Sequence, residues 1–294
     1  MKILVTGANG QVGSELIRRG NTRGFQMLAS DVSDLDISNQ DAVNRYIENC
    51  KPDILINAAA YTAVDKAESE EELAYAINRD GAICLAQACL AANIPLFHIS
   101  TDYIFDGTKK SAYIETDAPN PKSVYGKSKL EADLAIESIL ENHIILRVSW
   151  VFGALGNNFV KTMLRLGLER DELKIVSDQH GSPTWAGAIA STLLDIAERY
   201  SSDAAIPWGT YHYSSQPTTT WYEFAGTIFD QAADLGMMEK RPKIDPICTH
   251  EFPTAAVRPQ NSTLDCSKIT KALRTTQPDW RTGLKEVLSE WREQ

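Results

Sequence analysis

The chain has 294 residues, 43% of them hydrophobic, and its 39 acidic residues outnumber the 29 basic ones to give a formal charge of −10. This length and apolar content suffice for one large domain or two modest ones around a sizeable core. The negative charge has the wrong sign for gripping a phosphate backbone, so nucleic acid is not an expected partner.

Hydrophobicity and cysteine usage indicate the compartment. No apolar stretch approaches the about eighteen residues of a membrane span, and the apolar run at residues 1–5 is too short for a signal peptide. The five cysteines are scattered and lack metal-ligand spacing, which fits a reducing environment. We therefore expect a cytoplasmic protein with no membrane partner.

The first half of the chain alternates short apolar runs with longer helical patterns. The expected strands are residues 3–5, 27–29, 54–56, 96–99 and 144–148. The expected helices are residues 12–20, 40–50, 70–92 and 124–142, each long enough to cross over between parallel strands. The predicted fold is α/β, with a doubly wound parallel sheet of the Rossmann type forming a dinucleotide-binding domain over residues 1–150.

After about residue 150 the pattern becomes irregular. Short strands are expected at residues 174–176, 210–213 and 244–247, separated by segments rich in Pro, Thr and Asn. Helices are expected at residues 187–200, 221–235 and 282–292. We expect residues 151–294 to form a smaller, irregular α/β substrate-binding lobe, with helix 187–200 packing back onto the first domain.

A glycine loop opens the first helix. Gly7, Gly10 and Gly13 follow the first expected strand directly, which is the context a dinucleotide-binding fingerprint requires. A Cβ at the first glycine would obstruct the turn, one at the second would hold off the pyrophosphate, and the helix N-terminus offers unpaired N–H groups. A glycine-rich turn without a ligand is the simpler alternative. The cofactor candidates in this loop are Gly7, Asn9, Gly10, Gln11 and Val12.

The choice of nicotinamide cofactor depends on the second strand. Asp31 ends this strand, where its carboxylate would accept hydrogen bonds from the adenosine ribose and repel a 2′-phosphate. That arrangement suits NADH. Arg18 and Arg19 follow the glycine loop and can turn toward a phosphate, so the residues leave NADH and NADPH open.

Three residues form the catalytic candidate. Tyr125 and Lys129 are four apart on an expected helix, so they emerge on one face, and a lysine ammonium would lower the tyrosine pKa from about 10. Thr101 ends the fourth strand, at the edge where a doubly wound sheet binds its ligand. Asn78, in the preceding helix, either belongs to a proton relay or is a buried amide bonded to backbone.

Further stretches support a resemblance along nearly the whole chain: residues 57–68, 100–107, 125–130, 147–153, 157–159, 178–184 and 258–262. With these and the glycine spacing, the sequence resembles extended short-chain dehydrogenases/reductases that act on nucleotide sugars, in particular those that reduce the C4 ketone of a dTDP-linked sugar. The resemblance implies hydride transfer from NADH or NADPH, with Tyr125 as proton donor, Lys129 as its partner and Thr101 as a hydrogen-bonding helper.

The resemblance also implies binding residues. Cofactor positions are Gly10, Gln11, Val12, Asp31, Asp36, Ile37, Ala60, Tyr61 and Thr62, and the small residues Ala58 and Ala59 would let the cofactor pass close to the backbone. Substrate positions are Thr101, Asp102, Trp150, Asn158 and Arg258. Structural alternatives remain: Asp36 beside Ser38 suits a helix start, the alanines suit a tight helix–sheet contact, and Trp150 suits a core.

Some relatives of this kind bind Mg²⁺ between two subunits through three glutamates. Glu15 matches the first position, but the second falls on Gly187, which cannot ligate, and the third falls near Glu290 or Glu293. Hard cations need several oxygen ligands at once, so the sequence argues against a metal site, and Glu15 suits a helix start instead. Whether the protein forms a homodimer stays open.

Three rival functions share the glycine loop. A nucleotide-sugar dehydratase places Glu after Thr-Asp, whereas here Tyr103 follows Thr101-Asp102. A nucleotide-sugar 4-epimerase would differ by retaining its cofactor. The regulatory subunit of methionine adenosyltransferase resembles the same reductases and would bind NADP without turning over a substrate.

Overall fold

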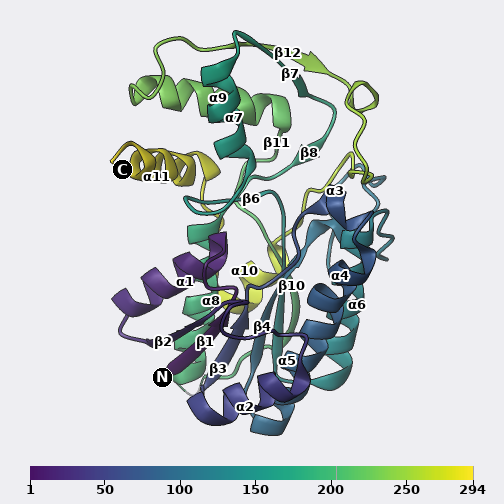
Figure 1. The fold of residues 1–294 in the computed structure, drawn as a ribbon, viewed down its shortest axis with the longest axis vertical. Coiled ribbons are helices and arrows are strands. Elements are labelled where there is room, and N and C mark those ends of the chain that lie inside the picture. Colours follow the sequence, from purple (N-terminus) through teal and green to yellow (C-terminus); the bar gives the residue numbers. More distant parts are fainter. Residues whose placement is uncertain (203, 294) are drawn as a thin grey trace.

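A computed structural model describes residues 1–202 and 204–293 (Figure 1). A parallel sheet with helices on both faces forms the larger part, and a smaller α/β lobe lies at one end of it. Among the described residues, no helix combines the length and hydrophobicity needed to cross a bilayer.

The central sheet has six strands in the order β10-β5-β4-β3-β1-β2, all parallel. They are β1 (Lys2–Thr6), β2 (Gln26–Ser30), β3 (Ile54–Asn57), β4 (Leu96–Thr101), β5 (His143–Val148) and β10 (Gly209–Tyr213). The expected doubly wound parallel sheet is confirmed. The strand order reverses between β1 and β3, and ligands of such sheets bind at the carboxyl ends beside that reversal.

Side chains alternate between two apolar layers along each strand. Ile3 and Val5 face one side with α1 (Gln11–Thr22), α8 (Ala186–Ser201) and α10 (Ser267–Leu273). Leu4 faces the other side with α2 (Gln40–Cys50), α5 (Gly81–Ala92) and α6 (Val124–Ile139). Helix α8 therefore packs onto the sheet, as the sequence predicts.

Strand β10 differs from the sequence-based expectation. Residues 210–213 fall in the range assigned to the second lobe, yet β10 pairs in parallel with β5 as the edge of the main sheet. Tyr211 and Tyr213 are buried in the same layer as α8. Their large apolar rings stabilise the strand there more than on a small lobe.

The single helix expected at residues 70–92 is also wrong in detail. The structure has α3 (Val64–Ala67), α4 (Glu71–Tyr75), the π-helical turn η1 (Ala76–Asp80) and then α5. Within η1, the Asn78 amide accepts from the Tyr61 N–H at 2.8 Å and donates to the Tyr61 carbonyl at 3.1 Å. Asn78 is thus a buried amide bonded to backbone and also, at 3.0 Å, to the Ser128 hydroxyl on α6, and the π turn points it at the loop after β3.

The smaller lobe has its own core. Its helices are α7 (Phe159–Glu169), α9 (Trp221–Asp234) and α11 (Trp280–Arg292), and its parallel pair is β7 (Glu172–Val176) and β12 (Lys243–Ile247). Phe224, Phe229 and Trp280 are fully buried among them. The short elements η2 (Asp102–Ile104), β6 (Val151–Phe152), β8 (His180–Gly181), β9 (Thr184–Trp185), β11 (Thr219–Thr220) and η3 (Thr249–Glu251) complete the chain.

A buried ion pair ties α6 to β5. The Arg147 Nε lies 3.0 Å from Asp133 Oδ2, and neither side chain is more than 7% exposed. Removing one partner of such a pair leaves an uncompensated charge in the interior.

We expect Arg147→Met to lower the free energy of unfolding by about 3–5 kcal/mol in urea denaturation. The exposed pair Arg165–Glu169 supplies the control, and Arg165→Met should change stability by less than about 0.5 kcal/mol. Equal effects of the two variants would contradict this account.

Candidate active site

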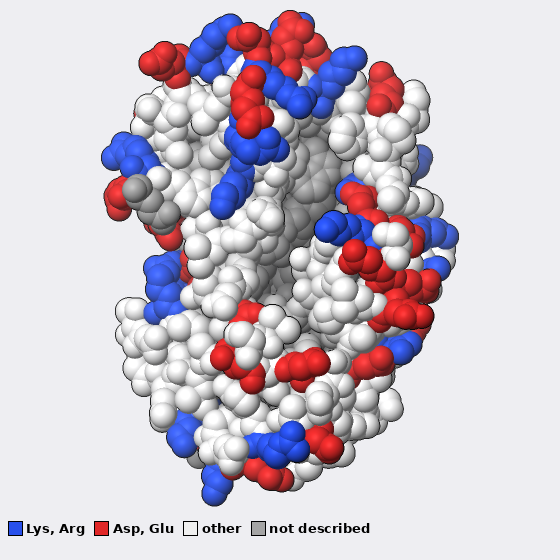
Figure 2. Space-filling model, in the orientation of Figure 1, with Lys and Arg blue, Asp and Glu red and all other residues white. Residues whose placement is uncertain are grey.

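A cavity of about 1210 Å³ lies between the sheet and the smaller lobe, at the carboxyl ends of the strands. Figure 2 shows a hollow in this face of the molecule, lined largely by uncharged residues. The volume exceeds that of a typical single-ligand pocket, so the cavity has room for two ligands side by side. Of the residues predicted from the sequence, the cavity is lined by Gly10, Gln11, Val12, Ala58, Ala60, Thr62, Thr101, Asp102, Tyr125, Lys129, Trp150, Asn158 and Arg258.

The glycine loop turns tightly from β1 into α1. Gly7 has φ +70°, and a Cβ there would lie 2.6 Å from the Ala59 backbone. A Cβ on Gly13 would lie 2.1 Å from the Gly7 carbonyl oxygen. In the described part of the chain, no side chain caps α1 at Gly10. The unpaired N–H groups of this helix end therefore face the cavity, where they suit a diphosphate.

Asp31 lies beside the glycine loop. One carboxylate oxygen accepts from the Asn9 N–H at 2.9 Å, and the other accepts from the Val32 N–H at 2.8 Å. The carboxylate thus fixes the loop and stands at the end of β2, where the sequence analysis expects the adenosine ribose. Neither Asp31 nor Asn9 lines the cavity.

Asp36 and Ile37 do not line the cavity either. The Asp36 carboxylate accepts from the N–H and hydroxyl of Ser38, at 2.9 and 2.7 Å. Ile37 is 7% exposed and packs beside Gly81 in the core. Asn39, rather than Asp36, caps α2 by accepting from the Ala42 N–H. The structure therefore gives both residues a local structural role, and their cofactor role stays a prediction.

The segment after β3 contributes unevenly. Ala58, Ala60 and Thr62 line the cavity, whereas Ala59 packs under Gly7 and Tyr61 turns its hydroxyl to the Glu70 carboxylate. The close Gly7–Ala59 contact joins the loop after β1 to the loop after β3, so it is not the helix–sheet contact offered as the alternative to a cofactor role. The small side chains of Ala58 and Ala60 leave room in the cavity, and the small side chain of Ala59 permits the close contact with Gly7.

Tyr125 and Thr101 meet in the middle of the cavity. Burial raises the pKa of Tyr125 to about 12, and a hydrogen bond with Thr101 opposes that rise. This direction differs from the lowering expected from Lys129. The Tyr125 phenol is consequently protonated at neutral pH, the state that a proton donor requires. The Tyr103 ring packs edge-on against it, with centroids 5.6 Å apart.

Lys129 is buried behind Tyr125. Its Nζ lies 2.8 Å from His98 Nε2 and donates to the Ile99 carbonyl at 2.7 Å. Burial lowers the pKa of Lys129 to about 8, although Asp133 opposes that shift. An isolated lysine in this position is therefore close to its titration range near neutral pH.

Asp102 follows Thr101 and faces the same cavity. The Thr101 hydroxyl donates to Asp102 Oδ1 at 3.1 Å, and burial raises the pKa of Asp102 to about 7. Across the cavity, Trp150 has φ +45°, a rare conformation for a bulky residue, and stacks on Trp221 with centroids 3.5 Å apart. Its indole N–H donates to the Ser262 hydroxyl at 3.1 Å. Trp150 is thus held as one wall of the cavity.

Asn158 and Arg258 reach the cavity from the second half of the chain. Asn158 caps α7, and its amide donates to the Gln11 side chain at 3.0 Å. Arg258 forms a two-pronged pair with Asp65, at 2.7 and 3.1 Å. Both residues join the glycine-loop side of the protein to the smaller lobe.

Glu15 has partners within its own helix. Its carboxylate accepts from Arg18 at 2.6 Å and from Arg19 at 2.7 Å. It lies beyond the first turn of α1, so the helix-start interaction expected from the sequence is wrong. Arg19 also lies over the Trp185 ring, and a Cβ on Gly187 would collide with both groups. These contacts give Glu15 and Gly187 local structural roles, and the argument against a metal stays a prediction.

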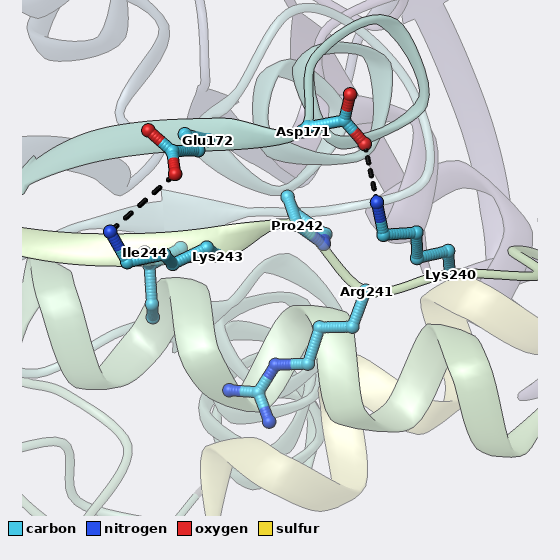
Figure 3. Close-up of a pocket in the computed structure, with 7 residues that line it drawn as sticks. All are labelled: Asp171, Glu172, Lys240, Arg241, Pro242, Lys243 and Ile244. Carbon is cyan, nitrogen blue, oxygen red and sulfur yellow. Dashed lines mark hydrogen bonds and ion pairs between the residues drawn. The ribbon is translucent and has the colours of Figure 1, made fainter.

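A second, smaller hollow lies on the outer surface of the small lobe. Figure 3 shows Lys240 directed at Asp171 and Lys243 directed at Glu172. All four side chains are more than half exposed, and ion pairs on the surface contribute little to the free energy of unfolding. We assign no chemistry to this hollow.

Several residues around the cavity are not among those predicted from the sequence. His98, Asp65 and Trp221 touch or line the site through the contacts given above. A polar residue within an otherwise apolar run is unusual in a buried strand. His98 in the run Leu96-Phe97-His98-Ile99 could therefore have been identified from the sequence as a candidate site residue. Asp65 and Trp221 carry no comparable local signal.

Comparison with known proteins gives consistent results. The family model described as RmlD substrate binding domain matches residues 1–293. The chain is 46% identical over 287 residues to dTDP-4-dehydrorhamnose reductase of Aggregatibacter actinomycetemcomitans, covering 97% of this chain and 98% of the relative. It is similar to the crystal structure of a dTDP-4-dehydrorhamnose reductase from Clostridium acetobutylicum, with a TM-score of 0.91, 39% identity and coverage of 99% and 100%. The dTDP-4-dehydrorhamnose reductase of Bacillus anthracis in complex with NADP also has a TM-score of 0.91, with 36% identity and coverage of 98% and 99%.

Proposed function

This chain belongs to the RmlD substrate binding domain family, and from that premise we propose that it reduces dTDP-4-dehydro-L-rhamnose to dTDP-L-rhamnose with NADH or NADPH. The observation that carries the proposal is the meeting of Tyr125, Thr101 and Lys129 in one cavity with the glycine loop. The glycine loop supports dinucleotide binding, and the three side chains support reduction of a carbonyl.

The residues present fit a nicotinamide dinucleotide. The backbone around Gly7 and Gly13 approaches so closely that a Cβ would fill the space, and the uncapped end of α1 directs N–H groups outward. Ala58, Ala60 and Thr62 would hold the cofactor along the end of β3. When bound, the reduced nicotinamide supplies a hydride to the C4 ketone of the sugar. Lys129 would hold the adjacent ribose.

Tyr125 donates the proton in this proposal. Its raised pKa keeps the phenol protonated, and the hydride converts the ketone to an alkoxide that accepts the phenolic proton. Thr101 would donate a hydrogen bond to the same substrate oxygen in place of its bond to Asp102 Oδ1. Lys129, when protonated, stabilises the tyrosinate that remains, and the low polarity of the cavity strengthens that interaction.

The remaining substrate residues line the two sides of the cavity. We assign Asp102 to the sugar hydroxyls and Trp150 to the sugar face, because both line the same cavity as Thr101. Arg258 and Asn158 suit diphosphate oxygens, since a guanidinium and an amide both donate hydrogen bonds. In this assignment Arg258 exchanges part of its contact with Asp65 for the substrate. Localisation in the cytoplasm stays a prediction of the sequence, as does the argument against a bridging Mg²⁺, and the number of subunits stays open.

The direct test follows the absorbance of NADH and NADPH on addition of dTDP-4-dehydro-L-rhamnose to the purified protein. The proposal expects stoichiometric consumption and formation of dTDP-L-rhamnose. A regulatory subunit would bind the cofactor and consume none. A 4-epimerase would interconvert sugars without net consumption. Either result would contradict the reductase assignment.

The preference between the two cofactors should respond to Asp31. Its carboxylate is fixed at the end of β2 by the Asn9 and Val32 N–H groups, and in this proposal it would repel a 2′-phosphate on the adenosine ribose. We expect Asp31→Ser to raise the ratio of kcat/KM for NADPH to that for NADH by at least about tenfold. Steady-state kinetics with both cofactors measures this ratio. Asp41→Ser, which removes an exposed charge from the first turn of α2, is the control and should leave the ratio unchanged.

A further inference from the structure

Three buried polar side chains form a line behind the catalytic tyrosine. Asn57 ends β3, His98 lies in β4, and Lys129 lies in α6, and each is 1% exposed. The Asn57 amide nitrogen lies 3.0 Å from His98 Nδ1, and His98 Nε2 lies 2.8 Å from the Lys129 nitrogen. The hydrogen positions along this line follow from which atoms can only donate.

The orientation of the Asn57 amide is fixed at its far end. The Ala59 backbone N–H points at Asn57 Oδ1 from 3.0 Å, and the Thr6 hydroxyl points at the same atom from 2.8 Å. A backbone N–H only donates, so the atom that receives it is the amide oxygen. The amide nitrogen therefore faces His98, and because it also only donates, His98 Nδ1 must present a lone pair.

His98 is neutral and carries a single ring proton. Burial holds the pKa of His98 well below its ordinary value, and a charge on Lys129 would lower that pKa further. Since Nδ1 accepts from Asn57, the proton is on Nε2 and points at the Lys129 nitrogen. An ammonium has no lone pair to receive it, whereas a neutral amine receives it and still donates to the Ile99 carbonyl.

The charges around Lys129 agree with a neutral amine. The titratable and charged groups around Lys129 and its neighbour Tyr125 come from four elements: His98 on β4, Asp102 and Tyr103 on η2, Tyr125 and Asp133 on α6, and Arg147 on β5. Asp133 already has Arg147 at 3.0 Å, so it does not require Lys129 for neutralisation. Burial brings the pKa of Lys129 to about 8, and a donor aimed at its nitrogen lowers the pKa further.

We propose that Asn57 and His98 are positioning residues that hold Lys129 as a neutral amine in the cofactor-free protein. Tyr125 then has no ammonium beside it until Lys129 takes up a proton. The consequence for turnover rests on the proposed function. If the ammonium is the active form, activity falls as pH rises through the Lys129 pKa, because the ammonium fraction falls. The pH at which kcat falls on the alkaline side then reports the pKa of Lys129, which depends on its contacts with His98 and, through it, Asn57.

The first test measures the tautomer of His98 directly. The nitrogen chemical shifts of ¹⁵N-histidine-labelled, cofactor-free protein at pH 7 distinguish protonated from unprotonated ring nitrogens, and the signal missing from His98→Gln assigns His98. We expect a protonated Nε2 and an unprotonated Nδ1. A proton on Nδ1, or on both nitrogens, overturns the proposal. This measurement needs neither substrate nor turnover, so it stands apart from the test of the reductase function.

The second test reverses the direction of the hydrogen bonds along this line by replacing the Asn57 amide nitrogen with an oxygen. Asn57→Asp keeps an oxygen toward Ala59 and Thr6 and places a second oxygen against His98 Nδ1, which moves the ring proton there. His98 Nε2 then accepts from the Lys129 ammonium, and we expect the alkaline limb of kcat to move up by about one pH unit or more. Asn142→Asp adds the same charge at an exposed site and should leave the limb in place.

The two readouts together decide the matter. In Asn57→Asp, a reversed His98 tautomer with an unmoved alkaline limb would overturn the link to Lys129. If Asn57→Asp fails to fold, the His98 tautomer in the unaltered protein still decides whether Lys129 accepts a hydrogen bond from His98 or donates one to it. His98→Gln offers an independent check, because its side-chain oxygen accepts from the ammonium and should also raise the limb.

Discussion

Replacing Tyr125 by Phe is expected to reduce kcat by about 10²–10⁴-fold, the usual contribution of a positioned proton donor. The variant loses one hydroxyl and keeps the ring that packs against Tyr103. Cofactor affinity should stay within about twofold, because the phenyl ring preserves the wall of the cavity. Steady-state kinetics with dTDP-4-dehydro-L-rhamnose measures the first effect, and titration of NADH fluorescence measures the second.

The neighbouring phenol provides the control. Tyr103 lines the same cavity, and its ring centroid is 5.6 Å from that of Tyr125, so Tyr103→Phe removes an equivalent group from an equivalent environment. Tyr103 has Arg258 as a neighbour, so Tyr103→Phe is compared by kcat, which separates proton donation from substrate binding. If Tyr125 is the donor, Tyr103→Phe loses far less kcat than Tyr125→Phe. The opposite order would move the donor role to Tyr103, and equal small losses would leave the reaction without a tyrosine donor.

Replacing Gly13 by Ala is expected to weaken NADH binding by about 100-fold or more, which corresponds to about 2.7 kcal/mol. The added Cβ would lie 2.1 Å from the Gly7 oxygen and 2.8 Å from Ala8 Cα. Both are backbone atoms, so no side-chain rotation relieves the overlap and the loop itself must move. Displacing the loop removes the helix end from the diphosphate.

Two further alanine variants calibrate this result. Gly226 lies inside α9, where the nearest obstacle to a Cβ is the flexible end of Arg241 at 3.3 Å, so Gly226→Ala should bind NADH normally. Gly10→Ala meets only the Gly7 oxygen, at 3.2 Å, and should show an intermediate loss. Thermal unfolding of each variant separates a displaced loop from a lost fold. Wild-type affinity in Gly13→Ala would refute the role given to the loop.

The parts of the fold that the sequence predicts are those with local signals. Helix α2 begins and ends at the predicted residues, and the strands of the first half lie within two residues of their predicted bounds. Apolar runs, glycines and helical spacing are properties of neighbouring residues, so one chain suffices to detect them. The cavity lining by Thr101, Tyr125 and Lys129 follows from the same kind of signal.

The features that the sequence analysis missed depend on distant contacts. The strand at residues 209–213 looks like any short strand until it is paired with β5, which lies more than sixty residues earlier. The Asp65–Arg258 pair joins residues 193 positions apart. His98 acquires its meaning only from Asn57 and Lys129, on two other elements. Ile37 fits both an adenine contact and a core position by its chemistry, and its packing beside Gly81 is not visible in the neighbouring sequence.

The return of the chain to the edge of the sheet has a consequence for biosynthesis. Because β10 covers β5 and α8 covers one face of the sheet, the first 150 residues do not complete their own domain when they leave the ribosome. Until residues 209–213 emerge, β5 presents an unpaired edge of the kind that invites aggregation. The smaller lobe is thus partly an insertion within the larger one, and a fragment ending near residue 150 is expected to be less soluble than the whole chain.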